Sequence, residues 1–142
     1  MLNAPAWAVE MLRTARVGRL ATANAAGQPL VVPICFALIE GRIYSAVDAK
    51  PKHTRELRRL RNVAENPHVS LVVDVWDEDW TKLAWVIVEG TAGLLTTDIE
   101  RAPALAALVA KYPQYVAMDL ATTAGPVLAV TPTRVMAWRM TE

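Results

Sequence analysis

The stretch Gly18-Arg-Leu-Ala-Thr-Ala-Asn-Ala-Ala-Gly-Gln-Pro-Leu-Val-Val-Pro-Ile-Cys-Phe-Ala-Leu-Ile-Glu-Gly-Arg-Ile-Tyr-Ser-Ala-Val47 predicts the fold. Strand-like runs at 18–23, 30–39 and 42–47 alternate with short turns that contain glycine. Runs joined in this way form antiparallel hairpins, so the stretch predicts a β-meander. Pro33 cannot donate a backbone hydrogen bond, which predicts an edge position or a bulge.

Further runs rich in β-branched residues predict strands at 68–76 and 83–95, with bend points at Gly90 and Gly93. A final pair of runs, 127–131 and 134–140, is divided by Pro132. Helical patterns occupy 6–13, the basic segment that ends at Asn66-Pro67, and 98–111. We therefore predict a mainly β fold, a six-stranded antiparallel β-barrel with peripheral helices, as a single domain over residues 1–142.

Composition sets limits on the environment of the protein. Of 142 residues, 54% are hydrophobic and 20% are charged, which is typical of a compact globular protein. Neither a signal-peptide pattern nor an apolar run near the ~20 residues of a membrane span is present, so no membrane association is expected. The single cysteine, Cys35, cannot form an internal disulfide, and we expect a cytoplasmic protein. Because Cys35 lies in an apolar run, we expect a buried, inert thiol.

Positive charge is concentrated in one segment, Lys50-Pro-Lys-His-Thr-Arg-Glu-Leu-Arg-Arg-Leu-Arg61. It carries six basic side chains and one acid, a net charge of +5, whereas the other 130 residues have a net charge of −4. Like charges three and four residues apart on a helix repel each other, so a solvated helix face explains this segment poorly. The segment predicts a binding site for an anion.

Helical geometry divides the basic segment into two faces. One stripe carries three guanidinium groups and an amide, namely Arg55, Arg58, Arg59 and Asn62. The opposite stripe carries Leu57, Leu60 and Ala64, by which the helix is expected to dock. Lys50 and Lys52 precede the helix N-terminus, where free backbone N–H groups already favour an anion, and His53 borders the same loop.

Three classes of anionic ligand compete for this site. Nucleic acid is disfavoured because the rest of the chain is acidic and no aromatic residue lies between Tyr44 and Trp76. A membrane surface is disfavoured because two leucines are too few apolar anchors. A phosphorylated small molecule or cofactor fits best. We expect no metal site, because the chain has two histidines and one cysteine without ligand spacing.

The same residues resemble a known family. The strings Gly18-Arg-Leu-Ala-Thr-Ala, Gly27-Gln-Pro-Leu-Val-Val-Pro-Ile-Cys-Phe and Gly41-Arg-Ile-Tyr44 resemble the opening of the split β-barrel FMN-binding superfamily, which includes pyridoxamine 5'-phosphate oxidase-like proteins. The string from Arg55 to Ser70 is similar to its cofactor-phosphate helix. Within the superfamily, the loop Asp74-Val-Trp-Asp-Glu-Asp-Trp80 most resembles that of F420-dependent oxidoreductases. The substrate residues of a vitamin B6 oxidase are not recognisable at the C-terminus.

The resemblance implies a homodimer with two cofactor sites at the subunit interface. Arg59 and Asn62 match the family's Lys/Arg-x-x-Asn pair on the phosphate helix, and Lys50 and Lys52 match the basic loop before it. Backbone contacts to the cofactor ring would come from Val47, Asp48 and Ala49. Two further candidates come from their own positions in the chain. His53 borders the basic loop and could contact the phosphate; the alternative is a loop residue or a helix cap. Trp80 lies in the acidic loop and could form a wall of the substrate pocket; the alternative is a core or interface residue.

Six cationic groups in a short span favour the deazaflavin coenzyme F420, whose tail carries a phosphodiester and several carboxylates, over FMN. Either cofactor would supply the hydride chemistry, so no catalytic acid or base of the protein is required. We therefore predict an F420-dependent oxidoreductase that reduces an unsaturated small molecule. Two alternatives are an FMN-dependent oxidase-like flavoprotein and a non-enzymatic flavin or deazaflavin binder. A haem-handling split barrel is disfavoured because neither histidine lies in a ligand context.

Overall fold

The computed structural model describes residues 2–47, 54–120 and 124–141. The strands are β1 (Gly18–Ala23), β2 (Pro29–Ile34), β3 (Ala37–Ile39), β4 (Arg42–Ala46), β5 (His68–Val75), β6 (Ala84–Leu95) and β7 (Val127–Arg139). The helices are α1 (Ala6–Thr14), α2 (Thr54–Glu65), α3 (Asp98–Lys111) and α4 (Gln114–Ala117), with a 3-10 turn, η1 (Trp80–Lys82). The predicted helices and most predicted strands are therefore confirmed to within a few residues.

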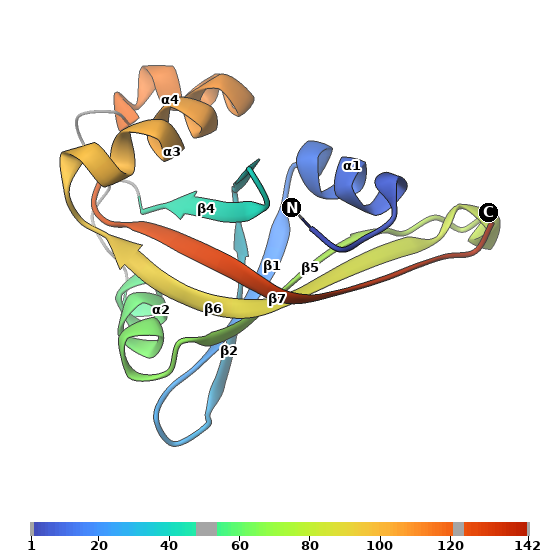
Figure 1. The fold of residues 1–142 in the computed structure, drawn as a ribbon, viewed down its shortest axis with the longest axis horizontal. Helices are drawn as coiled ribbons and strands as arrows, with labels where there is room; N and C mark the ends of the chain where they lie inside the picture. The colour runs from blue at the N-terminus through green and yellow to red at the C-terminus, as the bar shows by residue number, and fades with distance from the viewer. Residues whose placement is uncertain (1, 48–53, 121–123, 142) are drawn as a thin grey trace.

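One antiparallel sheet contains all seven strands in the order β2-β1-β5-β6-β7-β4-β3 (Figure 1). Only Cys35 and Phe36 separate β2 from β3 in the chain, yet these strands form opposite edges of the sheet. The sheet therefore curls into a half-barrel whose edges are linked at this corner. This confirms the predicted barrel class. The strand count is seven rather than six: the run 30–39 breaks into β2 and β3 at the corner, and the last two runs form the single strand β7.

Two prolines lie at special places in the sheet, one in an edge strand and one at an irregularity. Pro33 lies in the edge strand β2, opposite Arg19, as its missing donor predicts. Pro132 does not divide the last run, because β7 continues through it as a single strand. The ladder between β6 and β7 instead shifts register between Glu89 and Gly90, which pair with Arg134 and Pro132. A β-bulge thus accommodates the proline inside the sheet.

Inward-facing side chains from alternating strand positions form the main core, including Leu20, Leu71 and Val88. Helix α1 covers this core with Ala8 and Leu12, both fully buried. A second cluster packs α3 against the sheet, with Ala37, Ala104, Leu105, Leu108, Tyr112, Leu120 and Val127 as its buried members. Figure 1 shows α3 and α4 stacked on the β4 side, away from α2.

The corner between β2 and β3 is fixed by the C-terminal end of α3. Phe36 is fully buried, and its backbone N–H donates to the Tyr112 hydroxyl at 3.1 Å. The Lys111 ammonium donates to the Phe36 carbonyl at 2.9 Å and lies 4.1 Å from the centre of the Phe36 ring. Arg16 donates to the Lys111 carbonyl at 3.0 Å, so the segment before β1 joins the same cluster.

The expectation of a buried Cys35 is wrong, because its side chain is exposed. Val32 and Ile34 face the core, so strand alternation directs Val31, Pro33 and Cys35 outward. The Cys35 carbonyl accepts a hydrogen bond of 2.8 Å from the Ser45 hydroxyl.

The partial burial of Lys111 predicts that the stability of the protein depends on pH. Burial, followed by repulsion from Arg16, lowers the pKa of Lys111 from 10.5 to about 8. Between pH 8 and about 10 the unfolded state therefore binds more protons than the folded state, and stability rises with pH. Burial also raises the pKa of Tyr112 above 10.0, so this residue lowers stability at still higher pH. Because Lys111 is partly exposed, we expect a rise of only about 1–2 kcal/mol.

Denaturant unfolding at pH 7, 8, 9 and 10 measures this rise. Lys111→Met should remove most of it, whereas the exposed Lys82→Met should leave it in place. An unchanged pH profile in Lys111→Met would assign the rise to another group.

Candidate functional site

Helix α2, which contains most of the basic segment, is hydrogen-bonded through its last residue to the turn of the β1–β2 hairpin. The Glu65 carboxylate accepts from the Ala25 backbone N–H at 3.0 Å. Asn66, which follows the helix, accepts from the His68 N–H at 3.1 Å through its side chain. The helix packs against β1 and β6. These contacts set its position relative to the sheet.

A buried polar seam joins α2 to β1. Among the described residues, the buried polar or charged side chains are Thr22, Ser45, Arg59 and Asn62. Three of the four lie on α2 and β1. The Asn62 amide donates to the Thr22 hydroxyl at 3.0 Å, and Arg59 is only 8% exposed. Burying polar groups costs free energy unless they are hydrogen-bonded. The bond between Asn62 and Thr22 offsets that cost where α2 meets β1.

The seam corrects the predicted orientation of the helix. Ala64, expected on the docking face, is exposed, and Leu60 is only half-buried. Val63 is buried together with Arg59 and Asn62. The prediction assumed that the leucines must face the body, but Thr22 offers a polar partner from β1, so the amide side of the helix turns inward. Arg58 remains half-buried and Arg61 exposed.

Val47 follows β4 and is 4% exposed. Its carbonyl accepts from the Gly125 N–H at 2.9 Å, and its N–H donates to the Pro126 carbonyl at 3.4 Å. The Arg101 guanidinium of α3 in turn donates to the carbonyls of Ala124 and Gly125 at 2.7 and 2.6 Å. The backbone at Val47 is therefore held by α3 through two successive contacts.

Other predicted site residues lie outside what the structure describes. Asp48, Lys50, Lys52 and His53 fall in the segment 48–53, which is outside the described residues. Arg55 lies within α2.

Trp80 lies at the opposite end of the molecule from α2. Strand β5 begins at His68, just after α2, and ends at Val75, five residues before Trp80. Its eight residues span roughly 25 Å. Figure 1 shows the β5–β6 connection beside the C-terminus and α2 at the other end of these strands. One chain therefore does not bring Trp80 to the α2 seam.

The same distal tip exposes large aromatic side chains. Trp76 and Trp80 are 64% and 59% exposed, with ring centres 6.4 Å apart. The Trp80 turn is capped by Asp79, whose side chain accepts from the Thr81 N–H at 3.1 Å.

A hollow on the outer face of the sheet contains residues that the sequence reasoning missed. It has a volume of about 380 Å³ and is lined by His68, Ser70, Glu89 and Thr133, with small apolar side chains such as Ala21. Period-two alternation could have placed His68 and Ser70 on one face. It could not have revealed that Ser70 lies opposite Glu89, because the register depends on the whole sheet.

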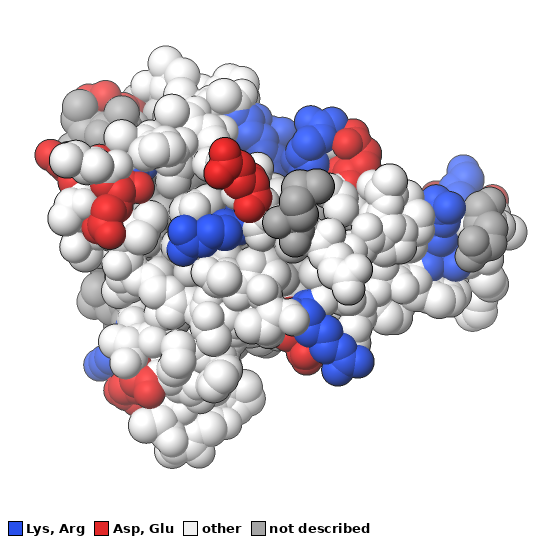
Figure 2. All heavy atoms as spheres, in the orientation of Figure 1, with Lys and Arg blue, Asp and Glu red and all other residues white. Residues whose placement is uncertain are grey.

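Charged side chains do not form a broad field on the face drawn in Figure 2, where lysine, arginine and acidic groups lie in small mixed clusters. Within the described ranges, we find no group of three or more His, Cys, Asp or Glu that could hold a metal ion. No described helix is both long and apolar enough to cross a membrane.

Solved structures of known proteins share this fold. A conserved hypothetical protein from Mycobacterium tuberculosis superposes with a TM-score of 0.77 at 20% identity, over 99% of this chain and 87% of that chain. The haem storage protein HutZ from Vibrio cholerae superposes with a TM-score of 0.72 at 16% identity, over 92% of this chain and 90% of that chain. An FAD-binding protein from Mesorhizobium loti superposes with a TM-score of 0.66 at 23% identity, over 94% of each chain.

The sequence also matches a characterised relative. It is 37% identical over 90 residues to a 5a,11a-dehydrotetracycline/5a,11a-dehydrooxytetracycline reductase of Streptomyces rimosus. The match covers 63% of this chain and only 62% of the relative's length. The family model of pyridoxamine 5'-phosphate oxidase matches residues 5–139, nearly the whole chain.

Proposed function

The chain belongs to the pyridoxamine 5'-phosphate oxidase family, and from that premise we propose that it is an F420-dependent oxidoreductase that reduces an unsaturated small molecule. The family and its fold favour flavin-type redox chemistry. The choice of F420 over FMN rests on charge, because the basic segment offers six cationic groups to an anionic tail.

The observation that carries the proposal is the buried seam of Thr22, Arg59 and Asn62. Arg59 is only 8% exposed and lies on a helix with three further arginines. A guanidinium group can bind two phosphate oxygens at once. Arg58 and Arg59 would hold the anionic tail, and Asn62 would fix the helix against β1. Lys50, Lys52, His53 and Arg55 would extend the same site.

When bound, the cofactor supplies the hydride. The protein's own part is to bind, orient and exclude water. The backbone at Val47 and Asp48 would lie against the ring, and hydrogen bonds to Gly125 and Pro126 keep the backbone of Val47 in place. Neither an acid nor a base of the protein is assigned a proton transfer.

The substrate class follows from the relative. That protein is named as a reductase of 5a,11a-dehydro compounds, a name that denotes an added carbon–carbon double bond. We extend this class, an activated double bond in a small organic molecule, to the present chain.

The proposed assembly is a cytoplasmic homodimer with two sites at the subunit interface. The exposed tip around Trp80 is rich in acid, with Asp77, Glu78 and Asp79, and lies far from the basic helix of its own chain. In a two-fold dimer, the tip of one protomer could meet the basic helix of its partner. Trp80 would then wall the partner's site.

Absorption titrations of the purified protein with F420, FMN and haem test the cofactor. We expect F420 to bind most tightly, and FMN more weakly, because its phosphate engages fewer of the cationic groups. Binding of none of the three would refute the cofactor site, and preference for haem would refute the redox assignment.

Catalysis is tested separately from binding. F420H2 should be oxidised when a substrate with an activated double bond is added. Tight F420 binding without turnover of any acceptor would instead favour the second candidate, a non-enzymatic cofactor binder with the same site.

A further inference from the structure

The hollow on the outer face of the sheet is produced by the β-bulge between β6 and β7. Glu89 pairs with Arg134 and Gly90 with Pro132, which leaves Thr133 as the extra residue. The Thr133 hydroxyl donates to the Glu89 carbonyl at 3.2 Å. Bulges reorient side chains and occur often beside functional sites. Gly90 also lines the hollow, and a Cβ at this position would meet the Thr131 carbonyl oxygen at 2.3 Å, so the backbone of β7 lies close against this glycine.

Three polar side chains converge at one side of the hollow. Ser70 and Glu89 are direct register partners on neighbouring strands, and His68 lies two residues before Ser70 on the same face. Such positions bring side chains within about 5–8 Å of each other. Ser70 and Glu89 are half-buried. The other side is formed by small apolar residues, including Ala21, Ala23 and Pro29.

The charge of this hollow is opposite to that of α2. Among the described residues that line it, Glu89 is acidic and none is lysine or arginine. Arg134, the register partner of Glu89, is exposed and does not line the hollow. A carboxylate with hydroxyl and imidazole neighbours and an apolar wall matches a cation with a small apolar body. Its volume of about 380 Å³ is within the range of small-molecule pockets.

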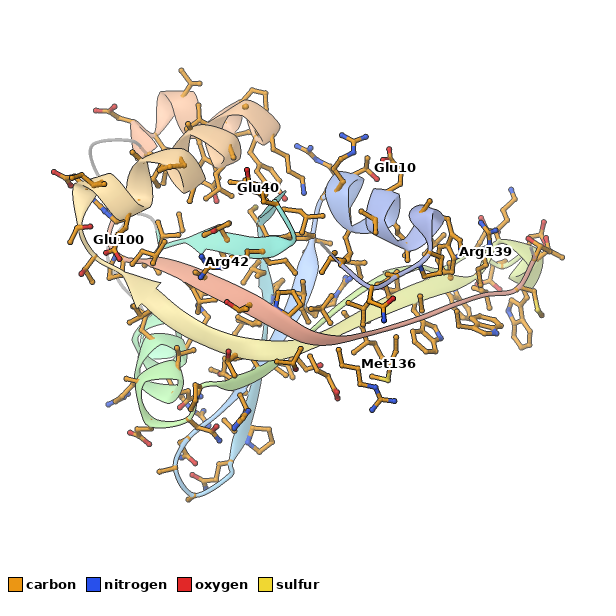
Figure 3. The ribbon with its side chains drawn as sticks, viewed as in Figure 1. Glu10, Glu40, Arg42, Glu100, Met136 and Arg139 are labelled. Carbon is orange, nitrogen blue, oxygen red and sulfur yellow. The ribbon has the colours of Figure 1, made fainter. Side chains whose placement is uncertain are left out.

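We propose that the hollow between β1, β5 and the β6–β7 bulge binds an organic ammonium group, with Glu89 as its anionic partner. The Ser70 hydroxyl and the His68 ring would accept further hydrogen bonds from the ammonium protons, and Ala21, Ala23 and Pro29 would contact the apolar body. This site does not depend on the proposed cofactor. It is formed by the outward face of the sheet. Figure 3 shows one side chain of this face, Met136 on β7, which points away from α1.

The test uses the purified full chain at pH 7, with benzylamine as the cationic probe and benzyl alcohol and benzoate as matched neutral and anionic probes. Backbone amide NMR titration reports both affinity and location. We expect benzylammonium to shift the amides of 68–70, 89 and 90, and to bind at least about tenfold more tightly than either matched probe.

Variants separate the carboxylate from the general shape of the hollow. Glu89→Gln should lower the affinity for benzylammonium about tenfold and leave the affinity for benzyl alcohol unchanged. Arg134→Ala removes a competing cation, so it should raise the affinity for benzylammonium or leave that affinity unchanged. Ala21→Leu should block all probes by filling the hollow, and it keeps the test available if Glu89→Gln does not fold. Equal binding of benzoate, shifts confined to other residues, or full affinity in Glu89→Gln would overturn the proposal.

Discussion

Replacing Arg59 with alanine is expected to weaken F420 binding by about 30-fold, because one pair of charge-assisted hydrogen bonds is worth about 2 kcal/mol. The guanidinium can hold two phosphate oxygens at once, and its burial limits competition from water. Arg59→Lys keeps the charge but loses this two-point geometry, so its affinity should fall between those of the wild type and Arg59→Ala. Fluorescence titration with F420 measures all three.

The matched control is Arg61→Ala on the same helix. It removes the same charge, but Arg61 is exposed, whereas Arg59 is buried. We expect its affinity to change less than about threefold, through loss of a screened, exposed charge. Equal losses in the two variants would show that only net charge matters and that the seam is not the site.

Burial of Arg59 also means that its replacement affects folding. Arg59→Met preserves most of the volume while removing the charge, so it distinguishes a binding defect from an unfolded helix. If Arg59→Met melts at the temperature of the wild type and yet loses F420 affinity, the residue acts in binding. Normal affinity in a stably folded Arg59→Met would remove Arg59 from the proposed site.

The order of secondary structure could be predicted from sequence because it depends on local chemistry. The turn at Glu40-Gly41 illustrates this: both residues have positive φ, 49° and 80°, as a tight hairpin between β3 and β4 requires. Asn66-Pro67 likewise ends α2 as expected, because a residue before proline is disfavoured in a helix.

The candidate site was less predictable because it depends on pairs of distant residues. The pattern of α2 defines two faces, but which face is buried depends on Thr22, forty residues earlier in the chain. Similarly, the break at Cys35 follows from closure of the sheet, and the run 30–39 contains no local signal for it. The alignment of Ser70 with Glu89 arises from the register of β5 with β6.

Gly90→Ala is expected to lower the free energy of unfolding by about 3 kcal/mol, the largest stability effect we predict for a single methyl group. An ideal Cβ at this position would lie 2.3 Å from the Thr131 carbonyl oxygen and 3.0 Å from the Pro132 Cα. Both contacts are with the backbone of β7, so no side-chain rotation can relieve them. The bulge itself would have to open.

Gly93, three residues later in the same strand, is the matched control. A Cβ there would meet nothing within 4 Å, and Gly93 pairs in register with Ala129. Gly93→Ala should therefore be neutral or slightly stabilising, because alanine loses less backbone entropy than glycine on folding. Thermal melts should place Gly90→Ala roughly 10 °C below the wild type and Gly93→Ala at or above it. Equal melting temperatures for the two variants would mean that the β6–β7 bulge adapts freely, and the hollow beside Gly90 would then have no fixed shape.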